Sequence, residues 1–427
     1  MIIHTVRPGE TVYSIASLYG VSPERIILTN ELNPPYALAV GQTLVILFYN
    51  QTYTVREGDT LASIAASFGT TTRILLRNNP NLNGVPLIYP GQTIVISYSQ
   101  DKEGSMQING YTYPFINRET FRKTLPYLSY LTVFTYGFTP EGELIIPDDT
   151  ELVNIAKTYD VAPIMLISTL GEDGLFNNNL SSILFANPQA QNNLIANILN
   201  NMRTKGYRGL DIDFEYIYPE EKDAYVAFVQ KVASTLRAEG FLTIVSLAPK
   251  TSVDQPGLLY EAHDYRRLGE AADAVLLMTY EWGYKYSKPL AISPINNVRA
   301  VLDFAVTQIP PSKIFMGIPN YGYDWPLPFV AGETEAKTIS NTEAVEIAVR
   351  YGAEIQFSEE SQAPFFFYSD ENGIRHEVWF EDARSIRSKL ALVPEYGILG
   401  ASYWNILNFF PQNWAVLNLL YDIDPAL

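Results

Sequence analysis

Residues 208–215 of this 427-residue chain read Arg208-Gly209-Leu210-Asp211-Ile212-Asp213-Phe214-Glu215, and this stretch decides the fold of the larger part of the molecule. Successive side chains of a strand point to opposite faces. A strand here therefore carries Asp211, Asp213 and Glu215 on one face and three apolar side chains on the other. In a closed barrel of parallel strands, the carboxylates point into the lumen.

The stretch is the fourth of eight short apolar runs that follow residue 106, and helical patterns separate these runs. Strands that alternate with amphipathic helices are typical of a parallel sheet, and eight is the strand number of a TIM barrel. We therefore predict an α/β fold with a (β/α)8 barrel. The predicted strands are 107–113, 131–138, 162–169, 209–216, 242–249, 274–282, 313–321 and 397–405.

The barrel region, residues 106–427, is longer than a minimal barrel requires, and the excess lies between the seventh and eighth predicted strands. This excess contains strand candidates of its own at 365–368 and 375–380. We predict an inserted α+β subdomain at about 326–380 that walls one side of a cleft. A polar, aperiodic stretch at 98–105 precedes the barrel and is predicted to be a linker.

The first hundred residues contain an internal repeat. The segment from His4 to Thr11 recurs from Tyr53 to Thr60, and Gly41-Gln42-Thr43 recurs as Gly91-Gln92-Thr93. Each copy predicts a strand, two helices and a second strand, with Ile15, Ala16 and Leu18 at a buried spacing in the first helix of the first copy. We therefore expect two small βααβ modules, at 2–48 and 52–97.

Composition excludes several classes of function. The 29 basic and 46 acidic residues give a net charge of -17, which argues against a nucleic-acid partner. The chain has no cysteine, which excludes disulfides, a thiol nucleophile and Cys-ligated metals. It has only three histidines, too few to favour a His-rich metal centre. We expect no metal and no cofactor, and we assign the chemistry to carboxylates and tyrosines.

The sequence also predicts no membrane partner. No apolar run approaches the roughly 20 residues of a membrane helix. The first residues lack the charged region and the apolar stretch of a signal peptide. We therefore expect a protein that is neither anchored nor exported by the usual routes.

The three acids of the fourth predicted strand are the candidate site. Neighbouring acids in a barrel lumen repel one another and lose hydration, so at least one is expected to stay protonated near neutral pH. Glu215 would lie at the carboxyl end of the strand, where a general acid is expected. The residues alone leave two alternatives open, a divalent-metal site and a structural hydrogen-bond network.

The two repeats resemble lysin motif (LysM) modules, which share the Gly-Asp-Thr turn, the Ser-Ile-Ala helix and the Pro-Gly-Gln before the last strand. The resemblance implies binding of N-acetylglucosamine-containing polymers through that turn and the loop before the last strand. Capping of the following helices is the alternative role of Thr11 and Thr60. The implied contacts are Gly9, Glu10, Thr11 and Val12 with the loop near Tyr36 and Leu38, and Gly58, Asp59, Thr60 and Leu61 with the loop near Leu82 and Asn83.

The barrel region resembles glycoside hydrolase family 18, whose signature is Asp-Gly-x-Asp-x-Asp-x-Glu. Here the first Asp is replaced by Arg208, and the catalytic half is intact. Met278-Thr279-Tyr280-Glu281 resembles the family's Met-x-Tyr-Asp, with Glu in place of Asp. Trp404 matches the tryptophan that floors the subsite of the cleaved sugar.

This resemblance implies a substrate-assisted retaining mechanism, in which the sugar's own acetamido oxygen attacks the anomeric carbon. Glu215 would be the acid and then the base, Asp213 would accept the acetamido N–H, and Asp211 would share a proton with Asp213. Tyr280 would donate to the acetamido oxygen, and Trp404 would stack under the ring, whereas ordinary barrel core is the alternative role of both. Further expected substrate contacts are Glu281, Met278, Asn320, Tyr321 and Tyr323, with plain packing as the alternative for the last three.

Two LysM modules joined to this barrel resemble the spore cortex-lytic N-acetylglucosaminidases of the SleL/YaaH type from endospore-forming bacteria. The resemblance implies cleavage after N-acetylglucosamine in spore cortex peptidoglycan or its fragments during germination. It also implies synthesis in the mother cell and a place in the spore coat and cortex region, with other coat proteins as candidate partners. The alternatives are a chitinase and a catalytically silent glycan-binding coat protein.

Overall fold

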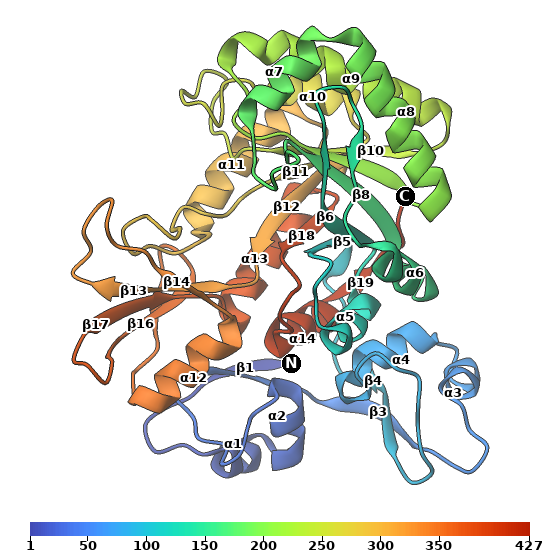
Figure 1. Ribbon diagram of the computed structural model, residues 1–427. Helices are drawn as coiled ribbons and strands as arrows, with labels where there is room; N and C mark the ends of the chain where they lie inside the picture. The colour runs from blue at the N-terminus through green and yellow to red at the C-terminus, as the bar shows by residue number, and fades with distance from the viewer.

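The computed structural model describes all residues from Met1 to Leu427. Its centre is a barrel of eight parallel strands (Figure 1), in which the first strand pairs with both the second and the last and so closes the sheet. The predicted TIM barrel and all eight of its strands are confirmed. In chain order they are β5 (Gly104–Thr112), β6 (Tyr130–Phe138), β8 (Ala162–Ser168), β9 (Gly209–Asp213), β10 (Leu242–Leu247), β11 (Ala274–Leu277), β12 (Ile314–Pro319) and β18 (Gly400–Trp404).

Several strands end earlier than predicted, always at the carboxyl end of the barrel. The strand β9 ends at Asp213 and β11 ends at Leu277, although apolar and aromatic residues continue beyond both. Tyr216 and Glu281 take the left-handed backbone conformation, with φ of 54° and 65°, which an extended strand cannot contain. The chain leaves the barrel at these points to form loops above the lumen.

Two short strands extend the barrel sheet at its margins. The strand β19 (Tyr421–Ile423) runs parallel to the start of β5, and β7 (Leu144–Ile145) runs antiparallel to the end of β6. Short 3-10 turns connect other elements. They are η1 (Pro80–Leu82), η2 (Leu125–Tyr127), η3 (Pro219–Glu221) and η4 (Pro311–Lys313).

The helices of the barrel form its outer layer, and local sequence sets their ends. In α8, the Asn187 side chain accepts from two backbone N–H groups of the first turn, Pro188 occupies the first helical position, and Gly206 closes the helix with φ of 76°. The barrel helices are α5 (Arg118–Thr124), α6 (Thr150–Thr158), α7 (Asn178–Ala186), α8 (Pro188–Lys205), α9 (Lys222–Ala238), α10 (Tyr265–Ala271), α11 (Ile295–Gln308), α13 (Ala383–Tyr396) and α14 (Pro411–Leu420).

The barrel has two apolar layers. The larger cluster lies between the strands and the helices and includes Leu210, Ile212 and Phe214, the apolar face predicted for the fourth strand. A smaller cluster fills the lumen. Asp211 lies in this lumen because its register partners in the neighbouring strands are Leu166 and Ile244, which belong to the inner cluster.

The segment between β12 and β18 forms the inserted subdomain, which lies beside the barrel (Figure 1). Its five antiparallel strands have the order β14-β13-β17-β16-β15, and one helix packs against them through Ala344, Ile347 and Ala348. The first of these strands begins slightly before the expected start near residue 326. The elements are β13 (Gly322–Leu327), β14 (Lys337–Ile339), α12 (Asn341–Tyr351), β15 (Gln356–Ser358), β16 (Ala363–Ser369) and β17 (Arg375–Trp379).

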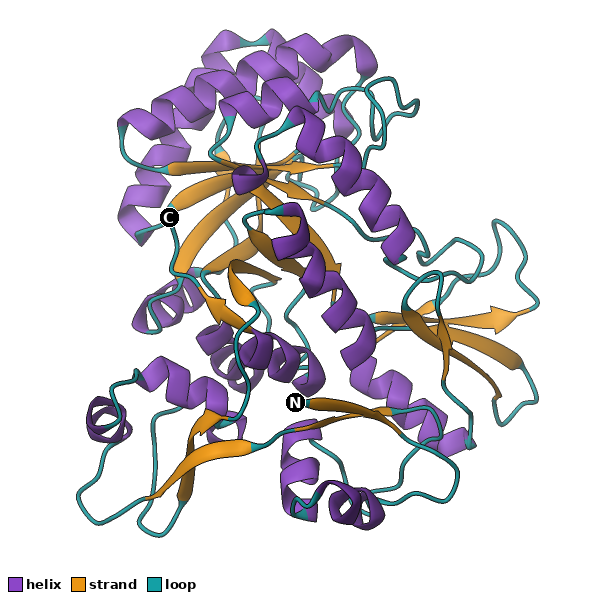
Figure 2. Cartoon of the chain, turned by 180° about the vertical axis from the view of Figure 1, so that it is seen from behind, coloured by secondary structure: helices purple, strands orange, loops and turns teal.

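The two N-terminal modules have the predicted βααβ order and lie on the same side of the barrel, at the bottom of Figure 2. The predicted burial of Leu18 is wrong, because this side chain is 63% exposed; Val12, Ile15 and Ala16 form the buried face of α1 instead. The elements are β1 (Ile2–Thr5), α1 (Val12–Tyr19), α2 (Pro23–Asn30) and β2 (Thr43–Ile46), then β3 (Tyr49–Thr54), α3 (Leu61–Ser67), α4 (Thr72–Asn78) and β4 (Thr93–Tyr98). None of the helices of the chain combines the length and the apolar character that crossing a bilayer requires.

Candidate active site

A cavity of about 500 Å³ opens at the carboxyl ends of the barrel strands. Asp213 at the end of β9, Met278 directly after β11 and Trp404 at the end of β18 all line it. Glu215, Tyr280 and Glu281 also lie in its wall. The structure thus gathers in one cavity six of the residues that the sequence predicted for catalysis or substrate binding.

Asp211 lies in the barrel lumen beside this cavity and is fully buried. Its Oδ2 accepts a hydrogen bond from the Tyr111 hydroxyl, and its Oδ1 accepts one from Ser246 Oγ at 3.2 Å. Burial raises the pKa of Asp211 to about 6, although the two hydrogen bonds act in the opposite direction. Asp211 therefore changes its charge close to neutral pH.

Asp213 is the member of the acid cluster that has a carboxyl oxygen without a hydrogen-bond partner. Its Oδ1 is buried and has no hydrogen-bond partner in the protein. Burial, followed by the neighbouring Glu215 and Asp211, raises the pKa of Asp213 well above its ordinary value. A buried carboxyl oxygen that lacks a partner at the wall of a cavity is available to a ligand group.

Glu215 lies two residues beyond the end of β9, at the cavity wall. Burial raises its pKa, and the charge of Glu281 raises it further. The raised pKa favours the protonated form of Glu215, which is the form that can donate a proton to a leaving group.

Tyr280 lies among the acids, and its position depends on a glycine of the neighbouring strand. Burial and then the charges of Asp213 and Glu215 raise the pKa of Tyr280 well above its ordinary value, so the phenol stays protonated. A Cβ atom on Gly317 would lie 2.6 Å from the Tyr280 ring. Gly317 therefore provides the space that the tyrosine ring occupies.

Glu281 lies at the rim of the cavity, and two tyrosines of the segment that follows β12 hold its carboxylate. The Tyr321 hydroxyl donates to Oε1, and the Tyr323 hydroxyl lies 3.1 Å from the same atom. Loss of hydration at the carboxylate raises the pKa of Glu281 despite both hydrogen bonds. Tyr321 and Tyr323 thus connect to the cavity through Glu281 and do not line it, so their direct contact with substrate stays a prediction.

Trp404 presents an aromatic surface to the cavity and is itself supported by aromatic edges. Its ring centroid lies 5.7 Å from that of Tyr111 and 5.1 Å from that of Phe134, both in edge-to-face geometry. These contacts fix the plane of the indole. The arrangement can carry one face of a sugar ring.

Asn320 lies outside the lining of the cavity. Its side-chain amide donates to the backbone carbonyls of Asn405 and Asn408, each at 2.9 Å, so it holds the loop that follows Trp404. The structure thus gives Asn320 an internal partner set, and its predicted substrate contact stays a prediction.

Arg208, which replaces the first Asp of the signature, lies at the opposite end of β9 from Asp213. Its guanidinium donates to the main-chain oxygen atoms of Leu427 and Gly240 at distances of 2.8–3.0 Å. The replacement therefore lies at the base of the barrel, outside the lining of the cavity.

Sequence reasoning missed most of the cavity wall. Tyr111 and Ser246 could have been found, because each lies close to the carboxyl end of a predicted strand. The loop aromatics gave no such signal, since loops far apart in the sequence deliver them. The missed lining residues are Tyr111, Tyr113, Phe134, Phe176, Tyr216, Ser246, Pro249, Leu259, Tyr260, Leu276, Trp282 and Tyr284.

The predicted glycan-binding turns of the two modules have matching geometry. Thr11 and Thr60 each cap the following helix, in a reciprocal arrangement with the serine three residues later. Glu10 accepts the backbone N–H of Arg7, and Asp59 accepts that of Arg56, each at 2.7 Å. The side chains of Val12, Leu61 and Leu82 are buried inside the modules and Asn83 donates to Glu119, so only the backbone of the first three could reach a ligand.

The acid cluster also bears on the metal alternative. No group of three or more His, Asp and Glu side chains has an arrangement that could hold a metal ion. Asp211 is instead engaged by hydroxyl donors, and Asp213 and Glu215 face the cavity. The geometry therefore favours proton transfer and hydrogen bonding over metal binding as the chemistry of this site.

Comparison with known proteins agrees with this geometry. The profile of the family described as "Glycosyl hydrolases family 18" matches residues 96–408, and that of the LysM domain matches residues 4–47 and 53–97. The chain belongs to glycosyl hydrolase family 18. The predicted membership of this family and the two predicted LysM modules are thus confirmed, and the chain is a glycoside hydrolase.

Relatives of this family 18 hydrolase match over its whole length. It is 41% identical to the cortical fragment-lytic enzyme of Bacillus subtilis, with 99% of each chain covered. It is 40% identical to the cortical fragment-lytic enzyme of Bacillus anthracis, with 97% of each chain covered. Its structure is similar to the crystal structure of the Bacillus megaterium spore cortex-lytic enzyme SleL, with a TM-score of 0.84, 38% identity, and coverage of 100% of this chain and 99% of the other.

Proposed function

We propose that this family 18 hydrolase cleaves the glycosidic bond after N-acetylglucosamine in spore cortex peptidoglycan or its fragments, during germination. The names of its full-length relatives support the substrate. One observation in the site carries the proposed reaction: the buried, unpartnered Oδ1 of Asp213 lies in the same cavity as Glu215 and Tyr280. This set suits a substrate that brings its own nucleophile, the acetamido group.

The proposed reaction begins with proton donation by Glu215 to the glycosidic oxygen, as the bond from that oxygen to the anomeric carbon breaks. The acetamido oxygen of the same sugar forms the new bond to the anomeric carbon, which gives an oxazolinium ion. Water then attacks this carbon as the bond from the carbon to the acetamido oxygen breaks, and the Glu215 carboxylate takes a proton from the water. The configuration at the anomeric carbon is retained because two displacements occur.

Asp213 and Tyr280 would orient the acetamido group. Asp213 accepts the acetamido N–H, and the Tyr280 phenol donates to the acetamido oxygen. The raised pKa of Asp213 favours its protonated form, and this proton must move before the carboxylate can accept the acetamido N–H. Asp211, whose pKa of about 6 lies close to neutrality, is the neighbouring group that can take it.

The cavity wall suits a chain of sugars. Pyranose rings have apolar faces that stack on aromatic side chains, and Trp404 offers such a surface inside a wall composed mainly of aromatic residues. Met278 lines the same cavity, and Glu281 lies at its rim. We assign Trp404 to the floor of the subsite that holds the cleaved sugar. We assign Glu281, which Tyr321 and Tyr323 hold by hydrogen bonds, to a contact with the neighbouring subsite.

The proposed location is the spore coat and cortex region, where the enzyme would meet glycan strands that contain N-acetylglucosamine. We infer synthesis in the mother cell and deposition on the forespore, with other coat proteins as candidate partners. The full-length relatives named above support this placement.

The decisive experiment is mass spectrometry of the products from purified spore cortex peptidoglycan and from chitin. We expect the wild-type enzyme to release cortex fragments with N-acetylglucosamine at the new reducing end. Glu215→Gln should release none but still bind the polymer, and the exposed Glu220→Gln, a matched change in the loop after β9, should behave as the wild type. Unchanged cleavage by Glu215→Gln would overturn the assigned acid, and cleavage of chitin alone would establish a chitinase.

A further inference from the structure

The two LysM modules share sequence and fold, but their surroundings differ at equivalent positions. Gly41 and Gly91 both take the left-handed conformation, with φ of 82° and 86°. A Cβ atom on Gly41 would lie 1.8 Å from the carbonyl oxygen of Ile355, whereas a Cβ atom on Gly91 would meet nothing within 4 Å. The end of the loop before the last strand is therefore packed in the first module and free in the second.

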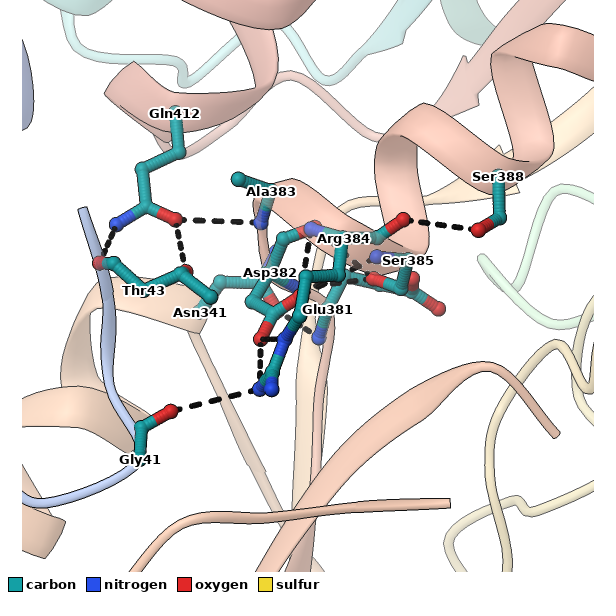
Figure 3. A network of polar contacts seen from close by, with 10 residues as sticks. All are labelled: Gly41, Thr43, Asn341, Glu381, Asp382, Ala383, Arg384, Ser385, Ser388 and Gln412. Carbon is teal, nitrogen blue, oxygen red and sulfur yellow. Dashed lines mark hydrogen bonds and ion pairs between the residues drawn. The ribbon is translucent and has the colours of Figure 1, made fainter. Parts of the chain in front are cut away.

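The barrel helices hold the first module at this place through hydrogen bonds to Gly41 and Thr43 (Figure 3). The Ile355 N–H of the inserted subdomain donates to Val40 O at 2.9 Å. From the barrel helix α14, Gln412 Oε1 accepts from Thr43 Oγ1 at 2.7 Å, and Gln412 Nε2 donates to Thr43 O at 2.6 Å. From the barrel helix α13, the Arg384 guanidinium donates to Gly41 O at 3.4 Å. The first module thus bridges the subdomain and two barrel helices.

The equivalent positions of the second module face solvent. Thr43 is buried, at 2% exposure, whereas its counterpart Thr93 is exposed. Ala39 is 5% exposed, whereas its counterpart Tyr89 is 63% exposed. The second module attaches to the barrel elsewhere, for example where Arg73 donates to Pro126 O, so its loop from 85 to 90 projects freely.

The free loop of the second module presents apolar side chains to solvent. Val85, Leu87 and Tyr89 are 40%, 59% and 63% exposed, while Ile88 between them packs against the core of the module. In the first module, Leu38 packs against the module core as Ile88 does in the second. Ala37 and Ala39 occupy the positions that correspond to Leu87 and Tyr89. At this loop, large apolar side chains are therefore exposed in the second module only.

We propose that the first module is a structural bracket that fixes the inserted subdomain to the barrel, a role that the second module does not share. The bracket supports catalysis indirectly, because the subdomain strand β13 carries Tyr323, which holds Glu281 at the rim of the cavity. Its effect on the cleavage rate rests on the proposed function.

The bracket is tested with two matched substitutions in the full chain. Gly41→Ala and Gly91→Ala impose the same backbone strain, but only the first adds a clash. We expect Gly41→Ala alone to lower kcat/KM severalfold on p-nitrophenyl N,N′-diacetylchitobioside, a soluble substrate too small to require polymer capture. Equal rates for both variants would overturn the bracket. Thr43→Val against Thr93→Val repeats the comparison with an almost isosteric change, should Gly41→Ala fail to fold.

Discussion

The Tyr111 hydroxyl donates a hydrogen bond to Asp211 Oδ2 inside the barrel lumen, from a strand 100 positions earlier in the chain. This hydrogen bond favours the ionised form of a carboxylate whose pKa burial has raised. Tyr111 therefore assists the proton transfer that we assign to Asp211, although it forms no part of the family signature.

Tyr111→Phe should lower kcat with little change in KM, because the lost donor acts on Asp211 and not on the bound sugar. A hydrogen bond to a charged group contributes about 1.5–3 kcal/mol, which predicts a loss of roughly tenfold to a hundredfold in rate. Steady-state kinetics on a soluble chitooligosaccharide provide the measurement. Tyr130→Phe is the control, since its hydroxyl bonds to the backbone N–H of Leu427; an equal loss there would argue against a specific role of Tyr111.

Catalysis should depend on pH through two opposing groups. As pH falls through about 6, Asp211 becomes protonated and can no longer take the proton of Asp213, so the rate should fall. As pH rises above the raised pKa of Glu215, the acid loses its proton and the rate should fall again. A profile of kcat/KM against pH checks this, and an acidic limb that stays in place in Asp211→Asn would contradict the assignment.

Asp211 should also destabilise the folded enzyme as pH rises. Its folded pKa of about 6 exceeds its ordinary value of 3.8, so the unfolded chain loses this proton first and the free energy of unfolding falls between these two pH values. A difference in pKa of this size corresponds to roughly 3 kcal/mol at neutral pH. Denaturant unfolding should show Asp211→Asn gaining stability over the wild type between pH 4 and pH 7, and a constant difference would contradict this account.

Gly317→Ala should reduce kcat, because the added Cβ would lie 2.6 Å from the ring of Tyr280 and displace it. Loss of one donor to a developing charge costs about 10²–10³ in kcat, which sets the upper end of the effect. The measurement compares Gly317→Ala, Tyr280→Phe and the double variant. If the glycine acts through Tyr280, the double variant is no slower than the slower single variant, whereas additive losses would show a separate effect.

Removing one partner of the buried ion pair between Lys389 and Glu381 should strongly lower the free energy of unfolding. Both side chains are 1% exposed, and Lys389 Nζ lies 2.8 Å from Glu381 Oε2. Lys389→Met leaves a buried carboxylate without its partner, which predicts a loss of about 3–5 kcal/mol in the free energy of unfolding. Adding Glu381→Leu should restore much of that loss; chemical denaturation of the two variants checks both statements, and a double variant as unstable as the single one would refute them.

The strands of the barrel could be predicted because each is a short apolar run bounded by polar residues, and the alternation at Asp211 and Asp213 assigns the lumen face. The ends of the strands could not be predicted, since Tyr280 and Trp282 continue the apolar pattern of β11 into a loop. The same limit applies to Asn320, whose role depends on carbonyl groups of Asn405 and Asn408 in a distant loop.

The repeat illustrates a second limit of sequence reasoning. Matched residues such as Gly41 and Gly91 predict the same backbone conformation, and the structure confirms it. Whether a matched position is covered depends on what packs against it, and Ile355 contacts only the first copy. The predicted equivalence of the two modules therefore held for the chain path and failed for their surfaces.

The hydrogen bond between Thr43 and Gln412 joins residues 369 positions apart. The ribosome synthesises Thr43 long before Gln412. Contacts between such distant segments form late, because a long loop must close first. The first module therefore waits for the segment that carries Gln412 before it can complete its packing against the barrel.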